Sequence, residues 1–326
     1  MTLIFCIVLL LSSCFKEEEP RDAVSIGTTI EMGSDYFNQV FYNIASNEVV
    51  SVNSYETWHL GFYAQADDYF IRLNAARVMY AFPTGEFNFE NVTSLDENLT
   101  GDIDHQSGDR SRLALDVNFV ESGDTAYSNS EVYILDLGTN EAGDYYGYKK
   151  IVFEKVSGNS YYIRFANLDN SEMYKAVVTK DETLNYVAFS LDNEGEVVNV
   201  EPDRNTWDLV FTNFTAEIDT LGSLIPYSVT GAYFNPFFVE GYQINDNTFD
   251  DFSTNDINES LFDNQLDIIG HDWKVFSLED NQYYIYNNKV YILKDINDNY
   301  YKLRFLDFYS QETGDKGYPT FEIQPL

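Results

Sequence analysis

The chain has 326 residues with 54 acidic and 19 basic side chains, a formal net charge of −35, and 17% aromatic residues. Its length suits one large or two ordinary domains, and 44% hydrophobic residues are enough for a buried core, which excludes wholesale disorder. Nucleic acids and anionic lipid surfaces are bound by clustered Lys and Arg, so the charge argues against both kinds of partner.

The start of the chain has the pattern of a lipoprotein signal peptide over residues 1–13. Residues 2–12 form an apolar run that is too short to cross a bilayer and is typical of a signal-peptide core. The tetrad Leu-Ser-Ser-Cys that ends at Cys14 resembles the lipobox of bacterial lipoproteins. That resemblance implies that Cys14 is the lipidation site and that only its lipid anchor touches the membrane. No basic residue precedes the run, which indicates a start upstream of Met1.

An acidic tether, residues 14–24, follows the signal peptide. Its charge run, Lys16 and three glutamates, is expected of a solvated linker. The same run resembles the export signal of Bacteroidetes surface lipoproteins, which implies an outer-membrane location facing the extracellular side. Both interpretations stay open. With Cys6 in the signal peptide and Cys14 as the anchor, we expect no disulfide and no cysteine-based metal site in the folded part.

From about residue 25 onward the chain alternates short Val/Ile/Tyr/Phe runs with Asn/Asp/Gly clusters, the pattern of antiparallel strands and turns. Clear runs are 131–137, 148–156, 160–165, 290–293 and 300–305. One short helix is expected within residues 255–266. The predicted fold class is all-β with little helix.

The strand pattern also repeats along the chain. The matching pairs of segments, in the same order, are 38–42 with 185–189, 47–52 with 195–200, 56–62 with 205–211, and 132–153 with 290–305. Four matches in one order predict two tandem copies of one sandwich-like β domain. We place the first copy at residues 25–180 and the second at residues 181–326.

Each copy carries a Trp motif at the start of a predicted strand. Period-2 alternation would put Trp58 on one face with Leu60 and Phe62, and His59 on the opposite face. The second copy has Trp207 in the same place. We interpret each Trp as a core residue, with a ligand platform as the alternative.

The second copy resembles the HmuY family of Bacteroidetes surface lipoproteins, and the first copy resembles it more loosely. The segments that carry the resemblance are 195–200, 207–211, 272–277, 290–305, 307–309 and 321–323. The resemblance implies an all-β, non-enzymatic haem-binding protein whose iron is held by two histidines from loops at one end. It also implies that haem is passed to an outer-membrane transporter.

The residues of this chain do not supply that pair of histidines. One ligand position corresponds to Leu278, which cannot bind iron. The other lies in the region 241–266, which has no His, Met or Cys. The methionines Met32, Met79 and Met173 fall elsewhere.

Among the three histidines, His105 is the candidate cofactor ligand, because it lies in a polar loop near the expected ligand loop of the first copy. His59 and His271 are interpreted as structural residues. Tyr233 and Tyr242 are conceivable haem ligands. We predict no metal site and no catalytic residue, since the chain has no Gly-rich phosphate loop, H-E-x-x-H or G-x-S-x-G motif.

The sequence thus predicts a surface-anchored lipoprotein that captures a small molecule, with haem as the implied ligand, for an outer-membrane transporter. The alternative is a carbohydrate-binding or structural partner in a surface complex. An enzyme would need a pair of carboxylates facing one cleft.

Overall fold

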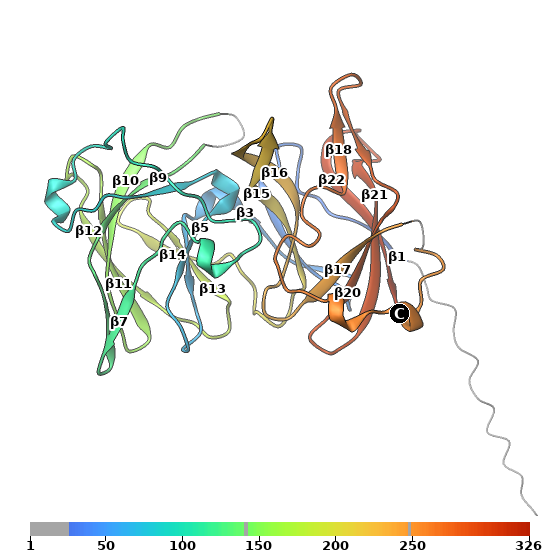
Figure 1. Ribbon diagram of the computed structural model, residues 1–326, viewed down its shortest axis with the longest axis horizontal. Coiled ribbons are helices and arrows are strands. Elements are labelled where there is room, and N and C mark those ends of the chain that lie inside the picture. Colours follow the sequence, from blue (N-terminus) through green and yellow to red (C-terminus); the bar gives the residue numbers. More distant parts are fainter. Residues whose placement is uncertain (1–25, 140–142, 247–248) are drawn as a thin grey trace, which may run out of the picture.

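The computed structural model describes residues 26–139, 143–246 and 249–326 (Figure 1). Their regular structure is made of β-strands and single-turn 3-10 helices, with no α-helix among the described residues, which confirms the predicted all-β class. The predicted signal peptide, the acidic tether and Cys14 lie outside the described residues. In the part of the chain that is described, no helix is long and apolar enough to cross a membrane.

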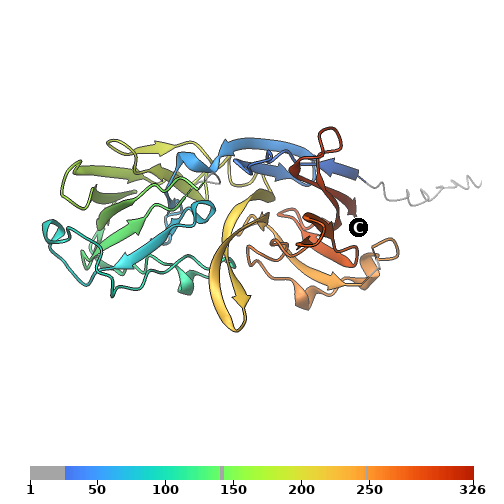
Figure 2. The same ribbon diagram turned by 90° about the horizontal axis from the view of Figure 1, so that it is seen from above.

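The strands pack into two lobes that lie side by side (Figures 1 and 2). The insert lobe is the continuous stretch 58–200, and the terminal lobe combines residues 26–57 with residues 201–326. In each lobe two antiparallel sheets enclose a hydrophobic core. One sheet of each lobe also faces the other lobe, so the molecule has four layers of sheet.

The insert lobe has an inner sheet, which faces the terminal lobe, and an outer sheet. The inner sheet has the order β14-β13-β4-β5, from β4 (Leu60–Tyr63), β5 (Ile71–Leu73), β13 (Tyr186–Ser190) and β14 (Glu196–Val198). The outer sheet contains β6 (Tyr80–Pro83), β7 (Phe119–Ser122), β8 (Thr125–Ser128), β9 (Val132–Asp136), β10 (Tyr148–Ser157), β11 (Ser160–Ala166) and β12 (Tyr174–Thr179). Phe62 joins the two layers, with its ring 6.3 Å from that of Phe153.

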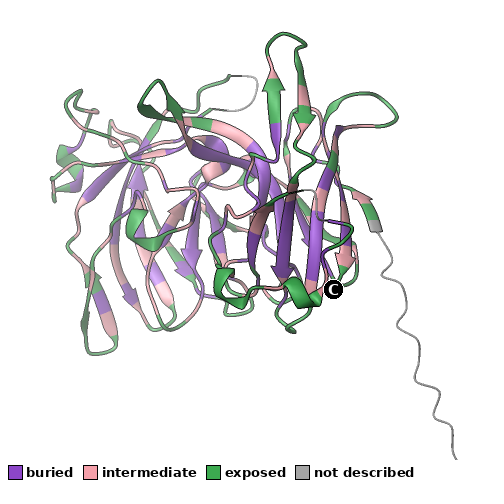
Figure 3. Cartoon of the chain, turned by 45° about the vertical axis from the view of Figure 1, so that its right-hand side comes forward, coloured by how far each residue is buried: buried purple, intermediate pink, exposed green. Residues whose placement is uncertain are grey.

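The terminal lobe is built in the same way. Its inner sheet has the order β16-β15-β2-β3, from β2 (Asn38–Asn43), β3 (Glu48–Ser54), β15 (Leu209–Thr220) and β16 (Ser223–Phe234). Its outer sheet has the order β1-β22-β21-β20-β17, from β1 (Ile26–Thr29), β17 (Glu240–Asn245), β20 (Lys289–Lys294), β21 (Tyr300–Tyr309) and β22 (Lys316–Pro325). A hairpin of β18 (Lys274–Ser277) and β19 (Gln282–Ile285) closes one end. Figure 3 shows burial concentrated on the strands and exposure on the connecting loops.

Short 3-10 turns link the strands. They are η1 (Tyr55–Thr57), η2 (Ala75–Arg77), η3 (Phe89–Asn91), η4 (Arg110–Arg112), η5 (Thr254–Asp256) and η6 (Glu259–Leu261). The prediction of one short helix within residues 255–266 is wrong, because this region contains two separate single-turn 3-10 helices, η5 and η6. Ser253 and Asn258 begin them with side-chain hydrogen bonds, and such local bonds favour turns over a continuous helix.

Strands are exchanged between the two predicted copies of the sequence, so that each lobe contains strands from both copies. Strand β2 pairs with β15, with Phe41 opposite Val210, and β13 pairs with β4, with Val187 opposite Phe62. The chain therefore passes from one lobe to the other twice, near residue 57 and near residue 200. The division of the sequence into two copies near residue 180 stays a prediction. Strands from before and after that residue pair with each other in both lobes.

The Trp motif differs from the expectation. Leu60 and Phe62 lie in the core of the insert lobe, but Trp58 packs in the cluster between the lobes, where Trp207 also lies. The alternation fails because Trp58 ends the turn η1 and precedes the strand. His59 was expected to face away from the core, yet it is fully buried and its Nδ1 accepts a hydrogen bond from the Leu191 amide.

Candidate functional site

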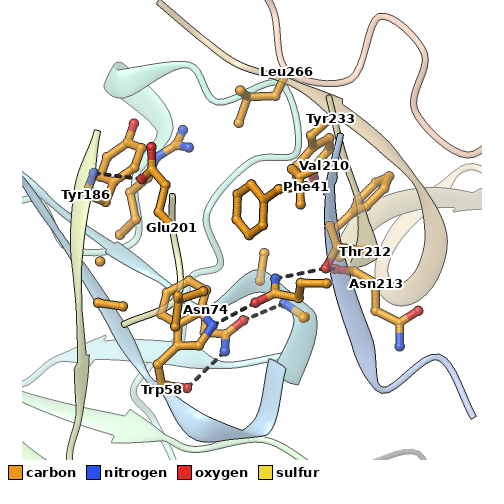
Figure 4. A pocket seen from close by; sticks show the side chains of 18 of the residues that line it. Phe41, Trp58, Asn74, Tyr186, Glu201, Val210, Thr212, Asn213, Tyr233 and Leu266 are labelled. Carbon is orange, nitrogen blue, oxygen red and sulfur yellow. Dashed lines mark hydrogen bonds between the residues drawn. The ribbon is translucent and has the colours of Figure 1, made fainter. Parts of the chain in front are cut away.

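The two inner sheets enclose a cavity between the lobes, shown in Figure 4. Its volume is about 150 Å³ and its walls are mostly apolar. Buried residues from both lobes pack around it, among them Ala188, Val200 and Val210. Phe41 and Trp207 meet edge to face with ring centres 5.0 Å apart. The cavity exists because strands of both lobes turn small and aromatic side chains toward the same space.

Hydrogen bonds hold the floor of the cavity in place (Figure 4). Trp58 donates from Nε1 to Gln39 over 2.9 Å, and Gln39 donates to the Thr212 hydroxyl over 2.9 Å. Asn74 donates to the carbonyl oxygens of Tyr55 and Trp58 at 2.7 and 2.9 Å. A buried network with satisfied partners is rigid, so the floor is preformed.

Glu201 is the acidic residue of the cavity wall. Its two carboxyl oxygens accept the backbone N–H groups of Asn185 and Tyr186, each at 3.0 Å. Burial nevertheless raises the pKa of Glu201 to about 8, because desolvation disfavours its charged form more than these bonds stabilise it. Glu201 is therefore largely uncharged at neutral pH.

A larger hollow of about 620 Å³, which we call the mouth, adjoins the cavity. Residues that line both spaces are Arg72, Tyr186, Pro236 and Leu266. A loop of each lobe closes in at Gly108, whose φ is +76° and where a Cβ atom would lie 2.6 Å from Leu266. The cavity and the mouth are thus adjacent spaces that share part of their lining.

Aromatic rings form one wall of the mouth. The residues are Tyr63, Phe70, Tyr186 and Phe237. Tyr63 and Phe70 stack with ring centres 4.4 Å apart, and Phe237 lies 5.8 Å from Tyr63. Such a group of rings offers a stacking surface to a flat ligand.

Three of the chain's eight arginines, Arg72, Arg110 and Arg112, also line the mouth. Arg110 pairs with Asp68 over 2.7 Å, and Arg112 pairs with Glu217 over 2.8 Å. The guanidinium of Arg110 lies 4.8 Å from the centre of the Phe70 ring. Asp68 and Asp109 also line the mouth, so an anionic ligand would pair with these arginines in competition with carboxylates of the protein.

His105, the candidate ligand from the sequence, lies in this mouth. Its Nδ1 is 2.7 Å from the Ser107 hydroxyl and its Nε2 is 3.5 Å from a Glu217 carboxyl oxygen. Burial, and then the charge of Arg112, lowers the pKa of His105. The ring is therefore mainly neutral at neutral pH, which is the form that binds a metal.

Two buried polar atoms of side chains in the cavity lining have no hydrogen-bond partner among the described residues. They are Nε of Arg72, from β5, and the hydroxyl of Tyr233, from β16, both shielded from solvent. Both side chains line the cavity. A buried donor without a partner is costly, so a ligand oxygen that accepts from them would be stabilised.

The two ligand positions implied by the family resemblance do not come together. Leu278 lies at the tip of the β18–β19 hairpin and is 89% exposed. That hairpin packs on the inner face of the terminal outer sheet, whereas Phe249 and Phe252 of the upstream loop pack on its outer face. A paired-histidine haem site is therefore not formed there.

The other candidates are structural. Tyr242 lies in the cluster on the outer face of the terminal outer sheet. His271 packs edge to face against Phe214, with ring centres 6.0 Å apart. Met32 and Met79 are buried in the two cores, and Met173 is exposed. Among the described residues, no group of three or more His, Cys, Asp or Glu side chains could hold a metal ion.

Sequence reasoning identified His105 but missed the arginines and rings around it. Arg110 and Arg112 form a basic pair in an acidic chain, which was an available signal. Arg72 and Tyr186 carried no such signal, because only the exchanged strands bring them together.

Comparison with known proteins gives a family. A solved protein from Bacteroides vulgatus, named as a "putative HmuY_like heme binding protein", is 10% identical over 92% of this chain and 90% of that chain, with a TM-score of 0.23. The apo HmuY analog of Tannerella forsythia is 12% identical over 94% and 97%, with a TM-score of 0.22. Apo PinO from Porphyromonas gingivitis is 11% identical over 93% and 97%, with a TM-score of 0.26.

No curated protein matches the chain. The family model described as HmuY protein matches residues 35–323, which is most of the sequence. The chain therefore belongs to the HmuY family, a family of non-enzymatic proteins.

Proposed function

We propose that this protein is a lipid-anchored lipoprotein on the outer face of the outer membrane that captures a small ligand for uptake. The observation that carries the proposal is the mouth between the lobes, which joins a wall of aromatic rings to three arginines. A flat ligand with acidic groups fits both features. The rings would stack on its face and the guanidinium groups would pair with its acids.

Haem is the first candidate ligand, since the family includes proteins named for haem binding. His105 would supply one axial nitrogen after exchanging its contact with Glu217 for the iron. The lining of the mouth contains no second His and no Met or Cys among the described residues. Tyr63 is a poor second donor, because burial, together with Asp67, raises its pKa to about 12.

The ligand test is a titration of the purified protein with haemin, followed by the Soret band. We expect a saturable shift that His105→Ala reduces at least tenfold in affinity. His271→Ala is the matched control, because this histidine packs on Phe214 and does not line the mouth. Absence of a shift in the wild-type protein would remove haem, and equal loss in both variants would remove the assigned role of His105.

Anchoring rests on the resemblance of the segment before Cys14 to a lipobox. We expect Cys14→Ala to abolish labelling with a palmitate analogue and to shift the protein from the membrane to the soluble fraction. A membrane-bound Cys14→Ala protein would contradict the anchor. Co-purification of the anchored protein with an outer-membrane transporter would support the proposed partner.

Carbohydrate capture is the second candidate function. The exposed edge of Phe237, beside Tyr63 and Phe70 at the mouth, is a surface on which a sugar ring can stack. Binding of the protein to a glycan array, lost in Phe237→Ala, would favour this alternative. A haemin shift with no glycan binding would exclude it.

A further inference from the structure

The small cavity behind the mouth has the features of a binding site of its own. Its volume of about 150 Å³ matches one six-membered ring, since an engineered apolar cavity of about 150 Å³ in another protein binds benzene. Haem is far larger than one such ring, so it cannot fit into the cavity and could bind only at the mouth. The cavity therefore calls for a separate, smaller ligand or a single ring of a larger one.

The walls of the cavity favour an aromatic ring. Phe41, Trp58 and Trp207 line it, and so do Phe214 and Tyr233, whose rings pack 4.1 Å apart. Phe41 and Tyr233 lie on either side of Val210 in the inner sheet of the terminal lobe, whereas Trp58 comes from the insert lobe. Aromatic rings prefer offset or edge-to-face contacts with one another, which these differently oriented walls provide. A sugar ring, with a hydroxyl on most carbons, would leave those hydroxyls without partners.

Two side chains of the cavity lining provide donors for an acid. Nε of Arg72 and the hydroxyl of Tyr233 lack hydrogen-bond partners among the described residues, they come from different lobes, and the charge of Arg72 acts on Tyr233. Arg72 already donates from Nη2 to the Gly108 carbonyl over 2.9 Å, which fixes the position of its guanidinium. A carboxylate can accept from a guanidinium and a phenol at once.

We propose that the inner cavity binds a small aromatic carboxylate, with its ring between the two inner sheets and its carboxylate on Arg72 and Tyr233. The ligand would thereby bridge the two lobes. The inference concerns a site that is distinct from the mouth, and it stands whether or not haem binds at the mouth.

The acidic groups near Arg72 and Tyr233 do not prevent anion binding. Both carboxyl oxygens of Glu201 are occupied by backbone N–H groups, and burial keeps this residue largely neutral. Asp104 accepts the backbone N–H groups of Leu73 and Ala114 at 2.8 and 2.9 Å, and burial raises its pKa. Burial likewise raises the pKa of Asp267.

The test uses benzoate as the acidic probe and benzamide as its neutral counterpart, on the full chain. Trp58 and Trp207 line the cavity, so tryptophan fluorescence reports binding directly, and calorimetry gives the affinity. We expect saturable binding of benzoate at least tenfold tighter than that of benzamide. Arg72→Gln should remove this preference, Tyr233→Phe should weaken benzoate several-fold, and Arg304→Gln, which lies on the far sheet, should change nothing.

A filling variant separates the cavity from the mouth. Ala188→Leu places a larger side chain in the cavity, so it should abolish benzoate binding and leave the haemin titration unchanged. If Ala188→Leu does not fold, Val210→Phe serves the same purpose from the opposite lobe. The inference is overturned if the wild-type protein does not bind benzoate, or if it binds benzoate and benzamide equally. Loss of haemin binding alone would count against the proposed function at the mouth and not against this site.

Discussion

The two lobes contain equivalent backbone hydrogen bonds between neighbouring inner-sheet strands. They differ in how the chain supplies those strands. In the insert lobe the amide of His59 donates to the Phe189 carbonyl over 2.9 Å. In the terminal lobe the amide of Asp208 donates to the Tyr42 carbonyl over 2.8 Å. The backbone N–H of Asn74 completes the first arrangement by donating a hydrogen bond to the His59 carbonyl over 2.8 Å. In the second, Asn235 makes the same bond to Asp208, also at 2.8 Å.

The difference lies in connectivity. The insert lobe is formed by one stretch of chain, whereas the terminal lobe needs residues 26–57 to pair with strands that begin at residue 209. A sheet is stabilised by which edges meet and not by the order in which the chain supplies them. The exchange also places both crossing points of the chain next to the cavity, so the candidate site lies where the lobes are tied together.

The largest expected effect comes from dividing the chain. Residues 58–200 alone retain both sheets of the insert lobe, so this fragment should fold and unfold cooperatively. Residues 181–326 alone lack β1, β2 and β3, and residues 26–180 lack β13 and β14. We expect both of these fragments to show poorly dispersed amide resonances in NMR spectra. Cooperative folding of residues 181–326 alone would show that the exchanged strands are dispensable.

The next effect concerns the two asparagines at equivalent places. The Asn74 side chain donates to two carbonyls, and that of Asn235 donates to the carbonyls of Arg204 and Trp207 at 2.7 and 2.9 Å. Asn74→Ala and Asn235→Ala should each lower the free energy of unfolding by about 2–4 kcal/mol, because one buried and one partly buried carbonyl lose their donor. Urea denaturation measures this.

Asn264→Ala is the control for these variants, since Asn264 makes one exposed hydrogen bond of 3.4 Å to Pro236. Its effect should stay within about 0.5 kcal/mol. A large loss for Asn74→Ala with none for Asn235→Ala would mean that the two arrangements, alike in geometry, are not alike in energy.

A third effect concerns how the stability of each lobe depends on pH. His59 and Asp208 occupy equivalent places in the two lobes, but one is a base and the other an acid. Nδ1 of His59 accepts the Leu191 amide, and Asp208 accepts the Ile44 amide over 2.7 Å. Burial, and then the charges of Arg77 and Lys149, lowers the pKa of His59 to about 3. Burial raises the pKa of Asp208 to about 6, against the opposing hydrogen bond of the Ile44 amide.

The signs follow from proton linkage. The unfolded state binds a proton at His59 below pH 6.5 and the folded state does not, so stability is lost as the pH falls from 6.5 toward 3. The folded state holds a proton at Asp208 above pH 3.8, so stability is lost as the pH rises from 3.8 toward 6. His59→Asn and Asp208→Asn should each remove one of these slopes, of at most about 1.4 kcal/mol per pH unit. Denaturation midpoints measured from pH 4 to 8 check this, and unchanged slopes would contradict these two pKa shifts.

The all-β class and most strands were predictable from the sequence, because alternation of apolar residues is a local signal. The exchange was not, since β2 and β13 carry nearly the same pattern and either could pair with β4. The prediction that Trp58 shares a face with Leu60 and Phe62 failed for a related reason. The period-2 argument assumes a continuous strand, and the turn η1 interrupts it just before His59.

The candidate site was only partly predictable. His105 could be singled out because histidines are few in this chain. The arginines and rings of the mouth come from segments far apart in sequence, such as Arg72 and Phe237, which only folding brings together. A site made at an interface between lobes leaves no contiguous motif.

The smallest expected effect concerns the ion pair that joins the lobes at the mouth. Arg112 of the insert lobe contacts Glu217 of the terminal lobe over 2.8 Å, and their side chains are 48% and 25% exposed. Solvent screens such a pair, so a double-mutant cycle with Arg112→Ala and Glu217→Ala should give a coupling of about 0–1 kcal/mol that falls with added salt. Ligand affinity should respond more strongly than stability, because Glu217 also contacts His105 at 3.5 Å and so restrains the proposed haem donor. A coupling above about 2 kcal/mol would instead show that this ion pair contributes strongly to holding the lobes together, beside the apolar cluster that packs between them.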